Sequence, residues 1–274
     1  MDLFEEVERI IDQGEICDSC MGQVFAERGH GLTNRERGTA WKTILAMEND
    51  NIIERKVDCW VCLGESYRFS EWADLVAAEL GKIEFKTYKV GTIMSPLLDE
   101  NAKLLRELIG VPIDSGESLK TEMNREVGKI VGDRMEKSFE GDGPDIIILL
   151  NVPTRSVEIQ VNPIFIYGRY KKLIRGIPQT KWPCGECKGR GTSIQGVCER
   201  CNGSGKQYEE SVQELIDSVA IIQMDGESST FHGAGREDID AKMLGTGRPF
   251  VVEIKTPKKR SIDLQVLEEN MNKN

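Results

Sequence analysis

The sequence predicts a fold of the α+β class, and three observations support this prediction. Helical hydrophobic patterns alternate with strand patterns from the N-terminus to about residue 175. A cysteine-rich segment follows at 184–201, and further helix and strand patterns lie beyond it. The chain has 274 residues, which is long enough for two modest domains. We therefore expect a long interleaved first region and a shorter second one.

The first half of the chain carries most of the predicted helices. Apolar residues recur at helical spacing at 2–12, 35–48, 69–81, 97–108 and 117–139. Thr33 precedes the second of these segments and Glu36 follows three residues later, which is the spacing of a capping box. Between the helices, EFKTYKVG at 84–91 predicts a strand that ends in a glycine.

Strand patterns occupy the middle of the chain and return near its C-terminus. The run at 145–152 is continuously apolar and the run at 156–162 alternates, so together they predict a hairpin that turns at Pro153 and Thr154. Beyond the cysteines the sequence predicts, in order, a short helix at SVQELI, a strand at VAIIQM, a Gly- and Ser-rich loop, an apolar strand at 249–255 and a final helix at DLQVLEENM.

Composition and charge narrow the classes of function. No apolar run approaches the roughly 20 residues of a membrane span, and the acidic N-terminus lacks signal-peptide features, so a cytoplasmic location is expected. The net charge of −10 argues against broad nonspecific binding to nucleic acid. The stretch 163–182 nevertheless has no carboxylate and five cations, namely Arg169, Lys171, Lys172, Arg175 and Lys181. This stretch is either a local nucleic-acid-binding surface or a solvated strand and turn.

All eight cysteines occur in pairs with CxxC spacing. Disulfides are disfavoured in a reducing compartment, so we interpret the pairs as two structural zinc sites with four thiolates each. The first site consists of Cys17, Cys20, Cys59 and Cys62, and the second of Cys184, Cys187, Cys198 and Cys201. A shell of four thiolates has no open position for substrate, so neither site is expected to be catalytic. Redox-active CxxC motifs and unligated core cysteines are the alternatives.

The second cysteine group coincides with an internal repeat. The pattern CxxCxGxG occurs at 184–191 and again at 198–205, and it resembles the zinc modules of DnaJ-type co-chaperones. Both copies can belong to one glycine-rich hairpin, because only ten residues separate Cys187 from Cys198. Such chaperones carry four repeats and a J-domain with an HPD motif, whereas this chain has two repeats and no HPD. A chaperone fragment is therefore the remote alternative.

The segment HGAGREDIDAKMLGTGRPFVVEI at 232–254 concentrates polar residues directly before an apolar strand. This arrangement suits a catalytic loop held on a rigid scaffold. Arg236 lies two positions before Asp238, and a nearby guanidinium lowers the pKa of an aspartate and keeps it ionised, as a nucleophile or general base requires. The alternative is an ion-paired surface turn.

Several motifs together resemble one enzyme family. GRED at 235–238 can be compared with GRTD, the active-site signature of TruA-type pseudouridine synthases, and the longer phrase around it resembles the archaeal and eukaryotic Pus-ten type of tRNA pseudouridine synthase. The same resemblance is carried by CDSCMGQVFAERGHGLTNRERG at 17–38, CWVC at 59–62 and YGRYKKLIRGIPQTKWPCGEC at 167–187. It implies that Asp238 is the nucleophile. Arg236 would then ion-pair with Asp238 or displace the flipped base.

The resemblance also implies a division of the chain into three parts. Residues 1–180 would form a zinc-braced, THUMP-like tRNA-binding domain, 181–208 a zinc hairpin at the junction, and 209–274 the first part of a pseudouridine synthase domain built on a largely antiparallel sheet. The implied partner is tRNA, bound at its T-arm and elbow through the five cations. The implied reaction isomerises uridine 54, uridine 55 or both in the TΨC arm, without an organic cofactor or a catalytic metal.

The end of the chain departs from the family pattern. Only 36 residues follow Asp238, and no tyrosine is among them, although family members carry a longer continuation with a tyrosine that packs on the target base. We therefore expect a truncated reading frame, or half of a split enzyme completed by a separate chain, with little activity alone. A non-catalytic tRNA-binding subunit is the alternative. Asp240 is expected to be structural, and His30 and His232 are expected to order loops or contact RNA rather than to catalyse.

Overall fold

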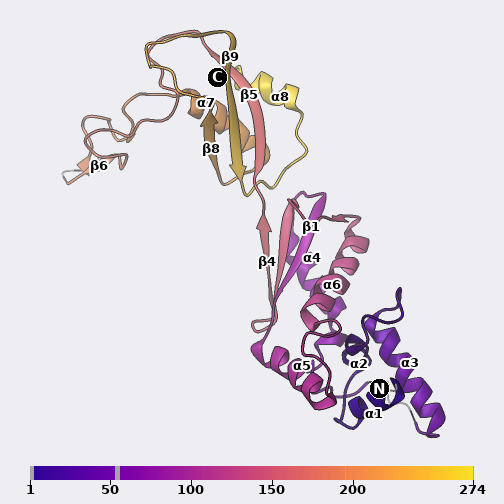
Figure 1. Cartoon of the computed structure of the whole chain (residues 1–274). Helices are drawn as coiled ribbons and strands as arrows, with labels where there is room; N and C mark the ends of the chain where they lie inside the picture. The colour runs from indigo at the N-terminus through magenta and orange to yellow at the C-terminus, as the bar shows by residue number, and fades with distance from the viewer. Residues whose placement is uncertain (1–2, 53–55, 195, 274) are drawn as a thin grey trace. The chain divides into compact units, whose positions relative to one another are not determined.

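The structure is a computed structural model that describes residues 3–52, 56–194 and 196–273. The chain divides into two compact units (Figure 1). The N-terminal unit comprises Met1–Gly81 and Lys86–Gln160, and the C-terminal unit comprises Lys82–Phe85 and Val161–Asn274. Both units combine helices with strands, which confirms the predicted α+β class. No described helix is long and apolar enough to cross a membrane.

The N-terminal unit contains all but two of the described α-helices. Its α-helices are α1 (Leu3–Ile11), α2 (Asp18–Val24), α3 (Asn34–Glu48), α4 (Phe69–Leu80), α5 (Pro96–Ile109) and α6 (Leu119–Met135), and a 3-10 helix, η1 (Glu65–Tyr67), precedes α4. The predicted capping box begins α3, because the Thr33 side chain accepts from the Glu36 N–H while Glu36 accepts from the Thr33 N–H at 2.7 Å. These helices match the five that the sequence predicts, with α2 as an addition.

Helix α2 packs directly against α3, and two glycines permit the close crossing. A Cβ on Gly22 would lie 1.8 Å from the carbonyl oxygen of Asn34, and one on Gly38 would lie 1.9 Å from that of Asp18. Both distances are far shorter than a van der Waals contact, so any larger residue would push the helices apart. The two glycines thereby fix the position of α2, which carries Cys20 of the first cysteine group.

Four strands form one sheet in the order β2-β1-β3-β4. They are β1 (Thr87–Ile93), β2 (Ser138–Phe139), β3 (Ile146–Asn151) and β4 (Ser156–Val161). β1 pairs parallel with both β2 and β3. Ile146, Ile148 and Leu150 alternate with less buried residues along β3 and are fully buried. β3 and β4 follow each other through a short turn at 152–155, which confirms the predicted hairpin.

Three antiparallel strands form the sheet of the C-terminal unit, in the order β5-β9-β8. They are β5 (Ile164–Lys172), β8 (Ser228–Gly233) and β9 (Met243–Lys255), and the helices of this unit are α7 (Val212–Met224) and α8 (Leu264–Met271). Residues of α7 form one buried core with Phe250, Val252 and Ile254 of β9, and Met271 of α8 packs against it. The inner face of this sheet is therefore covered by helix.

Two predictions for this unit are wrong in detail. VAIIQM at 219–224 is the second half of α7 rather than a strand. Ser211 caps this helix, and apolar residues recur every four positions along it, at Val212, Ile216, Ala220 and Met224. The six residues 219–224 are too few to show this helical spacing by themselves. β8 lies in the segment predicted to be a loop, because its Ser- and Thr-rich sequence lacks an apolar alternation.

The strand β5 belongs to the C-terminal unit, because it pairs with β9 along its length. The contacts thus divide the chain after Gln160, twenty residues before the predicted boundary at 180. The segment 181–208 contains a small hairpin, whose strands are β6 (Thr192–Ser193) and β7 (Gly196–Val197). The roles that the sequence assigns to these three regions stay predictions.

Candidate active site and metal centres

The loop at 234–242 connects β8 to β9 and contains the predicted catalytic pair. Its anchor is Glu237, which is 7% exposed. The Glu237 carboxylate accepts hydrogen bonds from the Tyr170 hydroxyl at 2.8 Å and from Gln179 Nε2 at 3.1 Å, and it pairs with Arg248 Nε at 2.9 Å. Burial raises the pKa of Tyr170 to about 12, so the hydroxyl remains a donor. Side chains from two other segments therefore hold the loop by its middle residue.

Lys172, at the end of β5, holds the backbone of the same loop. Its side chain is buried, with the residue 3% exposed. Its ammonium group donates to three carbonyl oxygens at 2.9 to 3.1 Å, those of Ile177, Asp238 and Ile239. Three acceptors use all three donors of an ammonium group, which makes burial of its charge tolerable. The loop is therefore fixed through its backbone at Asp238 and Ile239.

The side chains of Arg236 and Asp238 remain exposed on either side of the buried Glu237. Within the described residues, the Asp238 carboxylate has no hydrogen bond or ion pair, and it does not pair with Arg236. The Arg236 guanidinium instead lies over the ring of Trp182, with Cζ 5.2 Å from the ring centroid. The loop thus presents an unpaired carboxylate and a stacked guanidinium two residues apart. Asp240 is exposed as well, and its carbonyl oxygen accepts from Arg175 at 2.6 Å.

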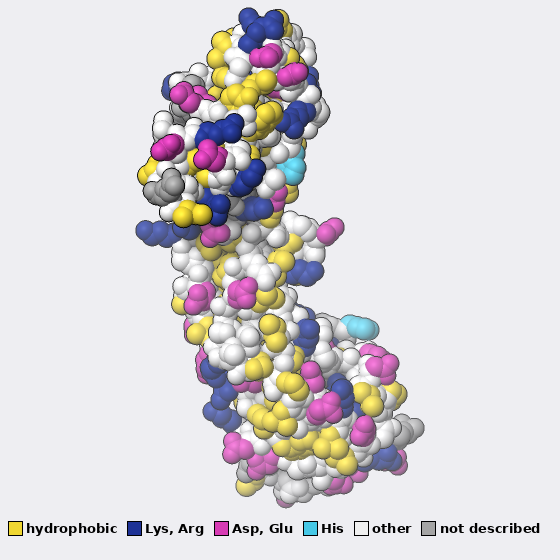
Figure 2. Space-filling view, turned by 90° about the vertical axis from the view of Figure 1, so that its left-hand side faces the viewer, with side chains coloured by type: hydrophobic (Ala, Val, Ile, Leu, Met, Phe, Trp, Pro, Cys, Tyr) yellow, Lys and Arg dark blue, Asp and Glu magenta, His cyan; other side chains and the backbone are white. Residues whose placement is uncertain are grey.

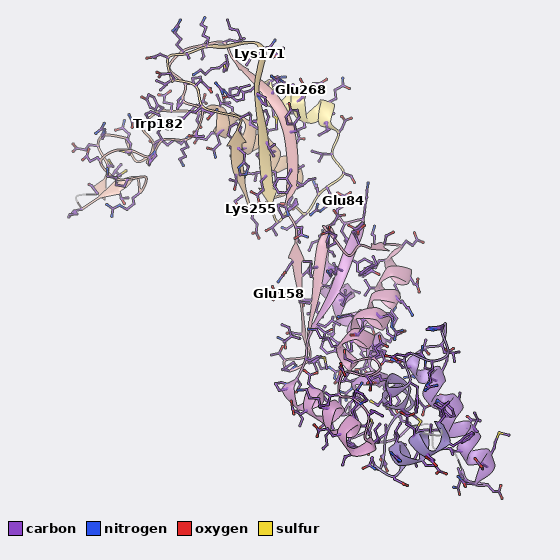
Figure 3. The ribbon with its side chains drawn as sticks, viewed as in Figure 1. Glu84, Glu158, Lys171, Trp182, Lys255 and Glu268 are labelled. Atoms are coloured by element: carbon purple, nitrogen blue, oxygen red, sulfur yellow. The ribbon has the colours of Figure 1, made fainter. Side chains whose placement is uncertain are left out.

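The five predicted RNA-binding cations occupy different environments. Lys172 does not fit the predicted RNA contact. Its buried ammonium group donates to three carbonyl oxygens and cannot reach a phosphate in this structure. The other four are exposed, namely Arg169, Lys171, Arg175 and Lys181. Figure 3 shows Lys171 near the end of β5, and Lys and Arg side chains are frequent on the face of the C-terminal unit visible in Figure 2. Of the two histidines, His30 lies between α2 and α3 of the N-terminal unit and His232 lies on β8.

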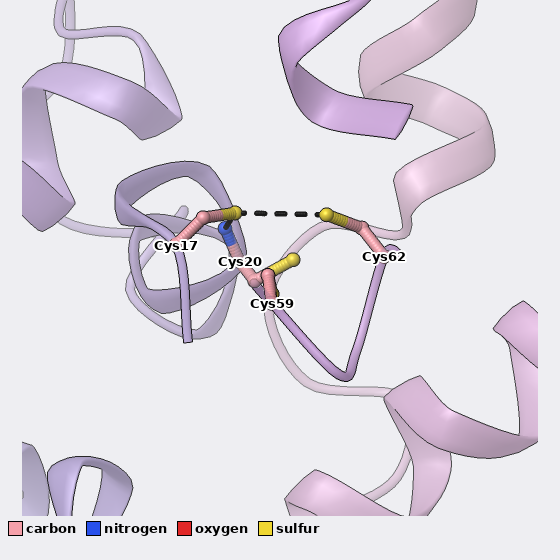
Figure 4. Close-up of side chains that lie close together, drawn as sticks. All are labelled: Cys17, Cys20, Cys59 and Cys62. Atoms are coloured by element: carbon pink, nitrogen blue, oxygen red, sulfur yellow. Dashed lines mark hydrogen bonds between the residues drawn. The ribbon is translucent and has the colours of Figure 1, made fainter. Parts of the chain in front are cut away.

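The eight cysteines form the two predicted groups of four, and all are buried. In each group the four sulfur atoms lie within 4.8 Å of one another (Figure 4 shows the first group). Cys17 and Cys62 are 3.7 Å apart in one group, as are Cys187 and Cys201 in the other. A disulfide would need about 2 Å, whereas the edge of a tetrahedron with Zn–S bonds of about 2.3 Å is about 3.8 Å. Both groups therefore fit a tetrahedral metal with thiolate ligands.

The local backbone prepares each group for a metal. Cys17 is the N-cap of α2 and Cys20 lies in its first turn. In the hairpin, the Gly191 N–H donates to Cys187 Sγ and the Gly205 N–H donates to Cys201 Sγ, both at 3.3 Å. Such donors stabilise the thiolate form that a metal needs.

The glycines of the repeat explain its spacing. A Cβ on Gly191 would lie 2.4 Å from the Gly203 carbonyl oxygen, and one on Gly205 would lie 2.4 Å from that of Gly189. The contacts are reciprocal, so the two copies of CxGxG pack against each other by their backbones. All four glycines also have positive φ. The repeated motif therefore encodes two equivalent loops, one from each CxxC pair. Their backbones can contact each other only because glycine occupies these positions.

The supporting residues Tyr170, Gln179, Glu237 and Arg248 were not identified from the sequence. They come from three separate segments, and the charge pattern around Glu237 gives no indication that it is buried. One signal was available for β5. Tyr170 and Lys172 are two positions apart on a strand, so they point to the same face, and Tyr170 belongs to the core.

Comparison with known proteins shows that this chain is similar to the tRNA pseudouridine synthases. The family described as "Pus10 THUMP domain, archaeal" matches residues 72–151, and "Pus10, C-terminal" matches residues 165–274. The chain belongs to the Pus10 family. The first match covers β1, β3, α5 and α6, which identifies the THUMP domain within the N-terminal unit.

Curated relatives agree with the family matches. A "tRNA pseudouridine synthase Pus10" from Halorubrum lacusprofundi is 46% identical over 274 residues, which is 99% of this chain and 64% of the relative. Proteins of the same name from Methanothrix thermoacetophila and Methanopyrus kandleri are 43% and 40% identical, over 99% and 94% of this chain and 64% and 63% of their own lengths. The chain thus spans a little less than two thirds of these relatives.

Proposed function

We propose that this chain supplies the tRNA-binding part and the catalytic loop of a tRNA pseudouridine synthase that acts on uridine 54, uridine 55 or both in the TΨC arm. The observation that carries the proposal is the loop at 234–242. Its backbone and its middle residue, Glu237, are anchored, while the carboxylate of Asp238 is exposed and unpaired. The names of the relatives support the same reaction.

In the proposed reaction the target uridine leaves the RNA stack and enters a site beside Asp238. Asp238 acts as a nucleophile on the sugar or the base while the bond between N1 and C1′ breaks, and the covalent bond that Asp238 forms is broken again before the product leaves. The uracil rotates, C5 bonds to C1′, and the proton lost from C5 is balanced by one gained at N1. Substrate and product are isomers, so the step consumes no oxidant or reductant.

Anchoring of the loop supports the role of Asp238 as nucleophile. An aspartate on a mobile loop would lose orientation at each turnover, whereas a fixed carboxylate keeps the geometry that attack requires. Because no described residue pairs with this carboxylate, both of its oxygens are available. The free N–H groups of Arg236 are suited to a phosphate, or to the place that the flipped base leaves.

Exposed cations and the THUMP domain support tRNA as the partner. Arg169, Lys171, Arg175 and Lys181 offer contacts to phosphates. Two structural zinc ions are proposed for the cysteine groups, since four-thiolate sites with no open position favour zinc. A cytoplasmic location is proposed because the substrate is tRNA. Binding of tRNA without catalysis is the second candidate, since the THUMP match and the exposed cations support RNA binding independently of the loop.

The test is position-specific mapping of pseudouridine in an unmodified tRNA transcript. The enzyme is a chimera that joins this chain to the part of the Halorubrum relative outside the matched region. Pseudouridine at position 54 or 55, and at no other uridine, is the expected result. A chimera that binds tRNA tightly without converting either uridine would instead establish the second candidate.

A further inference from the structure

Trp182 lies at the foot of the cysteine hairpin, where the chain enters it (Figure 3). Its carbonyl oxygen accepts from the Gln207 N–H at 2.9 Å, and the next residue, Pro183, forms a β-bridge with Lys206. The Trp182 ring meets the Tyr208 ring edge to face, with centroids 5.5 Å apart. Backbone and side-chain contacts thus join the two arms of the hairpin at Trp182.

The same ring carries the guanidinium of Arg236, 5.2 Å from its centroid. Arg236 is exposed, and no hydrogen bond or ion pair of its side chain is found among the described residues. An arginine side chain without such a contact samples many rotamers, and stacking on an indole restricts it. This contact engages no hydrogen bond of the guanidinium to a described acceptor, so its N–H groups stay available to a ligand.

The order of the hairpin depends on its cysteine group. The buried cluster of this segment consists of Cys184, Cys187, Cys198 and Cys201 alone. Its larger apolar side chains, Ile194 and Val197, are exposed. A segment this small without an apolar core is expected to need metal to hold its shape. Loss of the metal should therefore release the foot of the hairpin, and Trp182 with it.

We propose that Trp182 is a positioning residue for Arg236, and that the metal group of the hairpin sets the orientation of the Arg236 guanidinium through Trp182. The metal site would then act on the loop at 234–242 without touching the substrate. The value of this positioning for RNA binding rests on the proposed function, whereas the contact itself does not.

The first test uses fluorine NMR. The chain has four tryptophans, and all of them are labelled as 5-fluorotryptophan. Trp182→Phe identifies one of the four fluorine resonances. Arg236→Gln is expected to shift this resonance and to leave the other three in place. Cys198→Ser, which removes one ligand of the hairpin, is expected to shift and broaden it, after which Arg236→Gln has no further effect.

The matched control is Lys188→Ala, which removes an exposed cation of the same hairpin and is expected to leave the Trp182 resonance unchanged. A resonance insensitive to Arg236→Gln overturns the positioning contact. A resonance that responds to Arg236→Gln but not to Cys198→Ser overturns the link to the metal group.

The second test measures the affinity of the chain for a T-arm RNA hairpin in a double-mutant cycle. Trp182→Leu and Arg236→Gln are each expected to weaken binding about 2- to 5-fold, and the double variant should be no weaker than either one. Trp182→Phe keeps an aromatic face and should restore most of the affinity. Effects that multiply in the double variant contradict positioning. If the unsubstituted chain does not bind this RNA, the proposed function fails, while the fluorine shifts still decide whether Trp182 positions Arg236.

Discussion

Among the single residues of the candidate site, Glu237 has the largest structural effect. It lies between Arg236 and Asp238 in the sequence. Its carboxylate accepts hydrogen bonds from Tyr170 and Gln179 and forms an ion pair with Arg248. Burial of the middle residue of three places both neighbours at the surface. The sequence predicted the outer two residues from their chemistry. It could not predict the role of Glu237, because Tyr170 and Gln179 are more than fifty residues away in the chain.

Replacement of Glu237 tests this anchor. Glu237→Ala leaves the Arg248 charge and two buried polar groups without their partner, so it should destabilise the C-terminal unit by about 2 to 4 kcal/mol. Glu237→Gln keeps an acceptor and should cost less. Chemical unfolding, followed by the fluorescence of Trp182 in a variant with the other tryptophans replaced, measures both. Equal stability of Glu237→Ala and the unsubstituted chain would contradict the anchoring role.

A second buried carboxylate, Glu122 on α6, makes stability depend on pH. Glu122 is 2% exposed and accepts a hydrogen bond from Gln23 Nε2 at 2.7 Å. Burial raises the pKa of Glu122 from 4.5 to about 7. The folded state therefore binds more protons than the unfolded state between these values, and the stability of the N-terminal unit should fall as the pH rises through this window.

Glu122→Gln should remove that loss. We expect the variant to be more stable than the unsubstituted chain by up to about 3 kcal/mol near pH 8, and to show no such gain near pH 4. Denaturant unfolding at the two pH values measures the difference. Glu107→Gln, at an exposed position of α5, is the matched control. A gain of the same size at both pH values would show that charge burial is not its cause.

At the scale of elements, long periodic segments were predictable and short ones were not. The helices α3, α4, α5 and α6 and the hairpin of β3 and β4 follow from apolar spacing alone. Helix α2 has seven residues, so its position depends on the contact that Gly22 and Gly38 allow with α3. β8 is a polar strand that gains its hydrogen bonds from β9, a partner that no local pattern reveals.

The two cysteine groups give an element-scale prediction about metal content. The chain should contain two zinc ions, and Cys198→Ser should reduce the content to one without unfolding the N-terminal unit. Gly191→Ala should also weaken the hairpin site, because its Cβ would meet the Gly203 carbonyl oxygen. Gly185→Ala is the control, since a Cβ there makes an ordinary contact with Arg200. Elemental analysis of the purified chains measures the stoichiometry, and one zinc in the unsubstituted chain would refute the prediction.

At the scale of the whole molecule, cysteine spacing and charge segregation were the informative parts of the sequence. Both groups of four cysteines could be assigned because every cysteine is paired. Alternation along β5 could have separated Lys172 from its exposed neighbours Arg169 and Lys171, but the loop contacts of its ammonium group could not be predicted from the sequence. The limits of the two units also depend on a pairing between strands far apart in the sequence, that of β5 with β9.

Binding of tRNA should report this distinction through its salt dependence. Replacing Lys171, Arg175 or Lys181 by Ala should weaken binding at low salt, and each should reduce the slope of log affinity against log salt by about one unit. Lys172→Met should instead lower stability and leave the slope unchanged. Titrations at several salt concentrations measure these slopes. A slope that falls equally for Lys172→Met would place its ammonium on the RNA.

The proposed function depends on Asp238 being the nucleophile that the anchored loop presents. Its most direct test is the yield of pseudouridine in the T-arm with the chimera carrying Asp238→Asn, beside the same chimera carrying Asp240→Asn. We expect Asp238→Asn to abolish conversion while tRNA affinity is retained, and Asp240→Asn to remain active. Conversion by Asp238→Asn at the rate of the unsubstituted chimera, or loss of conversion only with Asp240→Asn, would exclude Asp238 as the nucleophile.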